Sequence, residues 1–220
     1  YETVATYMDS FAKADVKHIF LEVSRELQPA MNFLMKKGSY DQIQEFFTYH
    51  FSMPGVLSSE RHRHPQALTE IAWKAKQYDM KVHLVDDINP VLKLAADYPE
   101  QAQYFLKFIE HGDEYLKNLS PEEFAKFEHY SKRFIAARDV INEGVAVAIQ
   151  QKARDMHGKA EKAVILYGFG HSDGHQDIDE FLGPEETETV AIYSSLEFHD
   201  TEQGRVLAQQ KVDHDHFAFY

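Results

Sequence analysis

Apolar and polar positions follow two different periods along the chain. Short apolar runs bounded by turn residues predict buried strands over residues 16–23, 81–85 and 163–167. Apolar residues at helical spacing predict helices over residues 2–13, 26–37, 39 to about 50, and 66–78. Because strands and helices alternate, we expect an α/β fold with a mainly parallel sheet flanked by helices.

A long middle block interrupts this alternation. Residues from Pro90 onward are patterned as helix, with breaks expected near Pro99 and Gly112. The run Ser120-Pro121-Glu122-Glu123 has the features of a helix start, and helical pattern continues to about His157. We therefore predict a single α/β domain over residues 1–220 with a helical insertion at about 90–157. A short helix over 176–182 and strands over 188–195 and 212–220 complete the prediction.

Composition excludes some classes of function. The formal net charge of −13 argues against nucleic acid as a partner, because binding phosphates needs a basic face. The chain has no cysteine, which excludes disulfides and thiolate catalysis and leaves His, Asp and Glu as metal ligands. No apolar run has the length of a membrane span and none resembles a signal peptide, so we expect a soluble protein whose compartment stays open.

The stretch KAVILYGFGHSDGH, residues 162–175, has the strongest chemical pattern. An apolar strand ends at Gly168 and Gly170, whose small size lets the backbone turn tightly and approach a ligand. His171 then follows the carboxyl end of this strand, which is where ligands bind in open α/β sheets. We expect His171 to act as a general base or as a metal ligand; the structural alternative is a histidine that caps the strand end.

A metal ligand set is one interpretation of the same turn. His171, Asp173 and His175 alternate, so an extended backbone would place them on one side. Imidazole and carboxylate suit manganese, zinc or iron, and Glu22 and Asp86 at two other strand ends could complete the set. A solvated loop explains the spacing equally well, and Asp86 or its neighbour Asp87 could instead cap the next helix.

Three other positions are candidates for binding or catalysis. Glu22 lies in an apolar strand, where it could activate water, orient a base, or form a structural ion pair with Arg138. Arg138 and Asp139 lie in a helix with apolar neighbours, and Arg138 could bind a substrate carboxylate or stabilise an oxyanion. A surface ion pair is the structural alternative for these two residues.

Arg61 and Arg63 form a local cationic spot in an acidic protein. They could hold an anionic ligand such as a haem propionate, or they could be solvated loop charges. The histidines at positions 199, 214 and 216 carry no assigned role.

The order of the polar strand ends resembles one known superfamily. FLEV at residues 20–23, KVHLVD at Lys81–Asp86, SKRFIAARDVI at 131–141 and YGFGH at 167–171 stand in the order found in the erythromycin esterases, the haem-uptake protein ChaN, and the TraB/PrgY and TIKI proteins. In that superfamily an acidic residue follows a strand, an arginine lies on a later helix, and a G-x-x-H motif ends a further strand. The closing FAFY is similar to the superfamily's last strand.

The resemblance implies a hydrolase that acts on an ester or amide bond of a small molecule or peptide. It implies His171 as base or metal ligand, Glu22 as the residue that activates or orients water, and Arg138 as the residue that positions substrate or stabilises negative charge. Arg61, Arg63, Asp139, Gly168 and Gly170 would contribute to substrate binding. The cofactor would be a divalent metal, haem, or none, because branches of the superfamily differ.

One motif of the superfamily is missing. A first G-x-x-H, which holds catalytic residues in the esterase branch, should precede the opening helix, and nothing of that kind precedes Tyr1. We expect either that an N-terminal strand is lacking from this chain or that the resemblance does not hold. Two alternatives to the hydrolase follow: a ChaN-like protein that binds haem or another ligand without turnover, and a degenerate domain of a larger bacterial toxin or effector.

Overall fold

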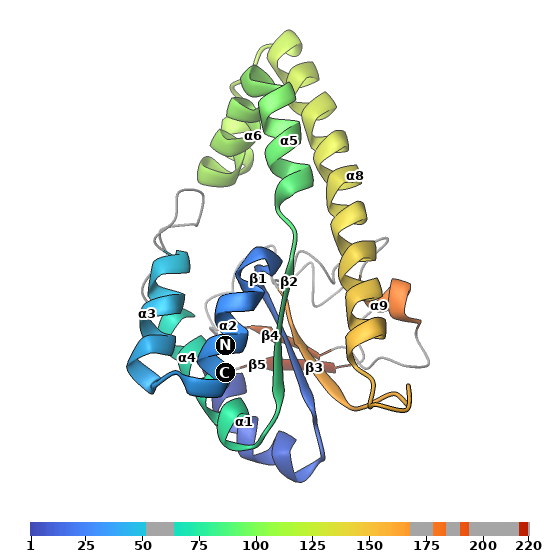
Figure 1. The fold of residues 1–220 in the computed structure, drawn as a ribbon. Helices are drawn as coiled ribbons and strands as arrows, with labels where there is room; N and C mark the ends of the chain where they lie inside the picture. The colour runs from blue at the N-terminus through green and yellow to red at the C-terminus, as the bar shows by residue number, and fades with distance from the viewer. Residues whose placement is uncertain (52–63, 168–177, 184–189, 194–215, 220) are drawn as a thin grey trace. The chain divides into compact units, whose positions relative to one another are not determined.

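The computed structural model describes residues 1–51, 64–167, 178–183, 190–193 and 216–219. It confirms the α/β prediction: the chain is mostly helical and contains a three-stranded parallel sheet flanked by helices (Figure 1). The helices are α1 (Glu2–Lys13), the 3-10 helix η1 (Arg25–Leu27), α2 (Gln28–Lys37), α3 (Tyr40–Phe51), α4 (His64–Gln77), α5 (Asn89–Asp97), α6 (Pro99–His111), α7 (Asp113–Leu116), α8 (Pro121–Lys152) and α9 (Ile178–Leu182). The strands are β1 (His18–Ser24), β2 (Lys81–Asp86), β3 (Ala163–Leu166), β4 (Val190–Tyr193) and β5 (His216–Phe219).

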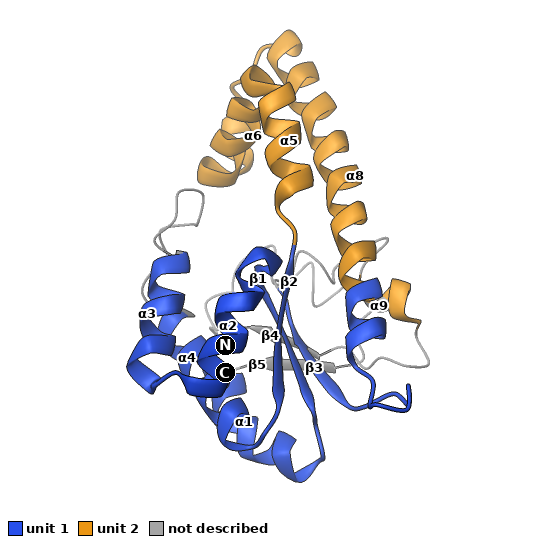
Figure 2. Ribbon diagram, viewed as in Figure 1, with its two compact units in different colours: residues 1–86, 147–168 blue, residues 87–146, 169–220 orange. Residues whose placement is uncertain are grey.

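The chain divides into two compact units (Figure 2). The first unit comprises Tyr1–Asp86 and Val147–Gly168, and the second comprises Asp87–Ala146 and Phe169–Tyr220. The second unit thus contains most of the predicted helical insertion. The arrangement as one domain stays a prediction.

The sheet of the first unit has the strand order β2-β1-β3. His18 pairs with Lys81 on one side and with Ala163 on the other, so the three strands run parallel and in step. The register between β1 and β2 shifts after Leu21, and Ser24 then pairs with Asp86. Because all three strands point the same way, their carboxyl ends meet at one edge of the sheet.

One face of this sheet forms the hydrophobic core. Alternate residues of a strand face the same side, and Ile19, Leu21 and Val23 of β1 all belong to the core cluster. The helices α1 to α4 cover this face. Their buried contributions are Val4, Ala5 and Met8 from α1, Met31 and Leu34 from α2, Ile43 and Phe47 from α3, and Leu68, Ile71, Ala72 and Ala75 from α4.

The side chain of Gln28 pairs with the edge strand β2. Its carboxamide oxygen accepts a hydrogen bond from the Leu84 N–H at 2.6 Å, and its amide nitrogen donates to the Val82 carbonyl at 3.0 Å. This pairing reproduces the pattern that a neighbouring strand would make. The first residue of α2 therefore satisfies backbone groups that the edge of the sheet would otherwise leave to solvent.

The second unit contains a helical part built on aromatic contacts. Phe105 of α6 lies with its ring centroid 4.5 Å from Phe134 and 5.5 Å from Tyr130, both in α8. The expected breaks are confirmed, because α6 begins at Pro99 and ends at His111, where the next residue, Gly112, has a φ of +64°. The start of α8 is a capping box, as predicted: the Ser120 N–H donates to Glu123 at 2.8 Å and the Glu123 N–H donates to the Ser120 hydroxyl at 3.3 Å.

Several predicted boundaries differ from the observed ones, among them the start of α2 at Gln28 and the start of α4 at His64. The helix α8 ends at Lys152 rather than near His157, because Asp155 accepts hydrogen bonds from the His157 and Lys159 N–H groups and closes a turn. The strand β1 begins at His18 rather than at residue 16. The predicted terminal strands are present as β4 and β5, which pair with each other in parallel within the second unit.

Candidate functional site

The carboxyl ends of the three strands bring polar side chains to one edge of the sheet. Glu22 lies near the end of the central strand β1, Asp86 is the last residue of β2, and Tyr167 directly follows β3. All three side chains are partly buried. This edge is the usual place for a ligand site in an open α/β sheet, and Glu22 and Asp86 lie at it as expected from the sequence, while their roles stay predictions.

Tyr167 and Asp86 are joined by a hydrogen bond across the central strand. The Tyr167 hydroxyl donates to Asp86 Oδ1 at 3.2 Å, although β1 separates the two strands that carry them. Burial raises the pKa of Tyr167, and the negative charges of Asp86 and Glu22 raise this pKa further. The hydroxyl therefore keeps its proton at all ordinary pH values and acts as a donor.

Glu22 extends from the face of β1 that carries His18 and Phe20, opposite the apolar core. Its charge affects the pKa of Tyr167, which places the carboxylate within electrostatic reach of the hydroxyl. The edge thus combines two carboxylates and one neutral O–H donor. Such a set can accept a proton from water at one group and donate a hydrogen bond from another.

Asp86 and its neighbour have different roles. Asp87 accepts hydrogen bonds from the Asn89 backbone N–H at 3.2 Å and from the Asn89 side chain at 2.7 Å. It therefore fixes the turn that leads into α5. The expected capping of this helix by an aspartate is not observed, because the N-cap of α5 is Ile88, without a side-chain cap hydrogen bond. Asp86 instead bonds Tyr167.

The structure does not test the roles of the other predicted site residues. Arg138 and Asp139 lie within α8, in the second unit, and both side chains are partly buried. Their functional roles and the ion pair between Arg138 and Glu22 stay predictions. The remaining predicted site residues lie outside the described residues; they are Arg61, Arg63, Gly168, Gly170, His171, Asp173 and His175.

A metal site is not tested by this geometry. Within the described ranges, no three His, Cys, Asp or Glu side chains converge in a way that could hold a metal ion. However, three of the five predicted ligands, His171, Asp173 and His175, belong to residues that the structure does not describe. Manganese, zinc or iron binding therefore stays a prediction, as does haem binding.

An open groove of about 370 Å³ lies in the helical part of the second unit. It is lined by Glu100, Gln103, Tyr104, Lys107, Tyr115, Asn118, Leu119 and Glu123. None of these is a predicted site residue. The groove is wide and polar, without the apolar lining that small-molecule sites usually have, so we give it no role.

Tyr167, His18 and His83 make polar contacts that were not predicted from the sequence. Tyr167 was considered only as part of the YGFGH motif, although a tyrosine directly after an apolar strand can donate a hydrogen bond at the edge of the sheet. His18 and His83 lie inside the apolar runs of β1 and β2 and were given no role. Histidine in an apolar strand is a signal in itself, because its ring nitrogens need partners when buried.

Comparisons of the chain with protein-family models, with curated proteins and with solved structures found no match. Among the helices of the described residues, none combines the length and the apolar character that crossing a bilayer requires.

Proposed function

We propose that the protein is a hydrolase that acts on an ester or amide bond at the carboxyl edge of the three-stranded sheet. The observation that supports this most is the hydrogen bond from Tyr167 to Asp86, which gathers side chains from the ends of all three strands around Glu22. The resemblance to the erythromycin esterase and TIKI superfamily points to the same edge and the same reaction class. The roles of His171, as base or metal ligand, and of Arg138 stay predictions from the sequence.

The chemistry that these groups support is acid–base hydrolysis. The Glu22 carboxylate accepts a proton from a water molecule while the water oxygen attacks the carbonyl carbon of the substrate. The electron pair of the carbonyl moves to its oxygen, and a hydrogen-bond donor such as the Tyr167 hydroxyl stabilises the negative charge that develops there. Collapse of this intermediate breaks the bond to the leaving group, which takes up the proton.

Asp86 positions the donor in this scheme. By accepting the hydrogen bond from Tyr167 it fixes where the hydroxyl oxygen lies, and its charge helps to keep the hydroxyl protonated. The hydroxyl can turn its hydrogen toward the substrate when the oxyanion forms. Asp86 is thus proposed as a positioning residue rather than as a catalytic one.

Hydrolysis of p-nitrophenyl acetate and of a peptide p-nitroanilide tests the proposal. Assays are run with and without added manganese, zinc or iron. Replacing Glu22 by Gln should lower kcat about 100-fold or more, because the proton acceptor is removed while the shape is kept. His171→Ala should lose activity to a similar extent.

Equal rates for the wild-type protein and the Glu22→Gln variant would contradict the proposal, as would absence of turnover under every metal condition. A haem titration then distinguishes the alternative. A Soret band that shifts and saturates on mixing haem with the inactive protein would favour the ChaN-like binding function.

A further inference from the structure

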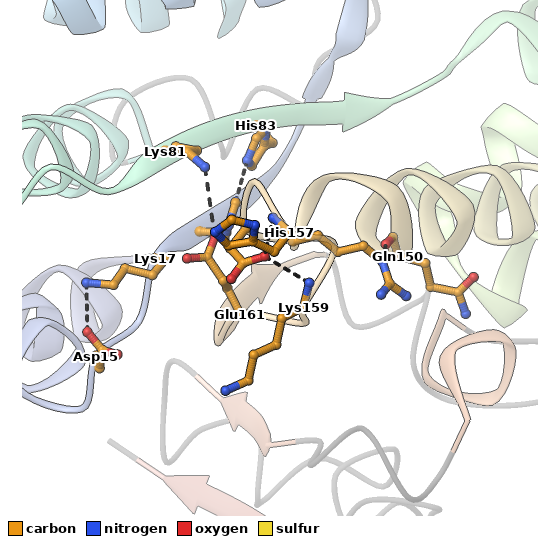
Figure 3. A network of polar contacts seen from close by, with 11 residues as sticks. Asp15, Lys17, Lys81, His83, Gln150, His157, Lys159 and Glu161 are labelled. Carbon is orange, nitrogen blue, oxygen red and sulfur yellow. Dashed lines mark hydrogen bonds and ion pairs between the residues drawn. The ribbon is translucent and has the colours of Figure 1, made fainter.

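The segment that ends α8 and leads into β3, residues 152–162, lies at the amino edge of the sheet, at the opposite ends of the strands from Glu22 and Tyr167. Its sequence, KARDMHGKAEK, contains four cations and two carboxylates, which is a net charge of +2 in a chain whose formal net charge is −13. Figure 3 shows His157 and Lys159 of this segment beside Glu161. The proposed hydrolase uses none of these residues.

The charged side chains of this segment differ in exposure according to their sign. Both carboxylate residues are partly buried, whereas all four cationic residues are exposed. The surface that this segment presents to solvent is therefore more basic than its composition suggests. The exposed cations are Lys152, Arg154, Lys159 and Lys162.

The two carboxylates are occupied within the fold. Asp155 accepts hydrogen bonds from the N–H groups of His157 and Lys159, at 2.8 Å and 2.9 Å. Glu161 Oε2 lies 2.8 Å from Nε2 of His18, whose side chain is fully buried. Neither carboxylate is paired with a cation of the segment itself, so the positive charges are not cancelled locally.

The cations contact neutral groups only. Arg154 donates to the carbonyl oxygens of Gln150 and Gly158, at 2.7 Å and 2.8 Å. Lys162 Nζ donates to the Ala14 carbonyl oxygen at 3.0 Å. The ammonium groups of the other two cations make no hydrogen bond or ion pair with any residue that the structure describes. The segment thus keeps its positive charge available for an anionic partner.

Met156 lies in the middle of this basic segment and is 91% exposed, more than any other large apolar side chain of the described residues. The turn that carries it is well ordered by its own contacts. Arg154 and Ala160 form a β-bridge, and the Asp155 N–H donates to the Lys159 carbonyl at 2.9 Å. The fold therefore holds one apolar side chain out in solvent among uncompensated cations.

We propose that residues 152–162 dock the protein on an anionic lipid surface, with Met156 in the headgroup region and the four cations against the anionic headgroups. Such a surface attracts clustered Lys and Arg residues, and apolar side chains enter its boundary with the acyl chains. A protein partner would need a broader apolar centre than one methionine, which is the only large apolar residue of this segment. A bilayer interface receives a single side chain without a matching shape.

The acidity of the rest of the chain does not prevent this docking. At physiological salt, exposed charges more than about 8 Å apart are largely screened, so the nearest charges dominate at a surface. Because the segment lies at the amino edge, the ends of the strands that carry Glu22 and Tyr167 point away from the lipid.

Co-sedimentation of the full chain with phosphatidylcholine vesicles, with and without about 30% phosphatidylserine, tests the proposal. The wild-type protein should bind only the vesicles that contain phosphatidylserine, and the bound fraction should fall about tenfold between about 0.1 M and about 0.5 M salt. Met156→Ser should weaken binding by about threefold to tenfold. Reversing two charges together, Lys159→Glu with Lys162→Glu, should weaken it by about tenfold or more.

Two matched controls lie in the second unit. Ile135→Ser removes an aliphatic side chain of α8 that is 57% exposed. Lys93→Glu with Lys132→Glu changes the net charge as much as the double reversal in the segment does, at two other exposed lysines. Both controls should bind vesicles as the wild-type protein does, and thermal unfolding verifies that each variant is folded.

Equal binding to the two kinds of vesicle, or binding to neither, would overturn the proposal, as would losses of the same size in the controls. If the double reversal at Lys159 and Lys162 does not fold, Met156→Ser and the salt dependence of the wild-type protein decide the question. Self-association in analytical ultracentrifugation that Met156→Ser abolishes, without vesicle binding, would also overturn it, in favour of a second copy of the chain as the partner.

Discussion

Tyr167 and Asp86 meet across the central strand of the sheet, with the hydroxyl of one 3.2 Å from the carboxylate of the other. The two residues stand 81 positions apart in the chain and on strands that are not neighbours. Another tyrosine–aspartate pair provides a natural comparison: the Tyr78 hydroxyl donates to Asp9 at 3.1 Å on the surface. The two pairs have the same chemistry but differ in burial and in their surroundings.

Removing the two hydroxyls should therefore have different effects. Tyr167→Phe should lower the free energy of unfolding by about 1 kcal/mol, because the hydrogen bond between the Tyr167 hydroxyl and the partly buried Asp86 is lost. It should also lower kcat for ester hydrolysis by about 10-fold to 100-fold. Tyr78→Phe should change neither quantity measurably, because its partner Asp9 is solvated. Urea unfolding and the p-nitrophenyl acetate assay measure both, and equal kcat values for the two variants would remove Tyr167 from the mechanism.

Metal content provides an independent prediction. If residues 168–175 bind manganese, zinc or iron, mass spectrometry of the purified chain should find one of these metals at stoichiometric level. His171→Ala should lose the metal, because an imidazole ligand has been removed. Absence of metal from both proteins, purified without chelator, would leave a metal-free esterase or a binding protein.

The pairing of Gln28 with β2 should contribute measurably to stability. Gln28→Ala removes the donor to Val82 and the acceptor of Leu84, and should lower the free energy of unfolding by about 1–2 kcal/mol. Asn32→Ala serves as the control, because it removes only an exposed 2.8 Å contact of the same Gln28 side chain and leaves the strand pairing intact. Urea unfolding should find Asn32→Ala close to the wild type; an equal effect of both variants would mean that the strand pairing adds nothing.

Two glycine-to-alanine substitutions should change the free energy of unfolding in opposite directions. A Cβ on Gly38 would lie 2.8 Å from the Leu34 carbonyl oxygen and 2.9 Å from its Cα, which are backbone atoms that cannot move aside. Gly38→Ala should therefore lower the free energy of unfolding by about 1–3 kcal/mol. Gly144 lies in α8, and a Cβ added there would have no neighbouring atom within 4 Å, so Gly144→Ala should raise stability by about 0.5–1 kcal/mol. Thermal unfolding of the two variants compares these signs directly.

Local chemistry explains which elements were predictable. The break at Gly112 and the capping box at Ser120 before α8 each depend on residues that are close together in the chain, so the sequence shows them directly. The same holds for the stop of α2 at Gly38. The predicted start of β1 and the predicted end of α8 were wrong. The first depends on pairing with β3 and the second on the turn at Asp155, and the spacing of apolar residues reveals neither.

The contacts of the site depend on strand register, which the sequence does not display. Glu22 and Asp86 were expected at the carboxyl edge because each ends an apolar run. The hydrogen bond between Tyr167 and Asp86 follows only when the strand order and the pairing of β1 with both neighbours are known. Register also brings His18 beside His83, which is why two histidines in separate apolar runs carried no signal of a contact.

Gln28 has one more consequence, which concerns association between molecules. An exposed edge strand is a template on which a second copy of a protein can add its own strand and begin an aggregate. On β2 the backbone groups of Val82 and Leu84 are already engaged by the Gln28 side chain, so an incoming strand would first have to displace it. The single Gln28 side chain therefore makes this edge of the sheet a poor site for the addition of a second strand and for fibril growth.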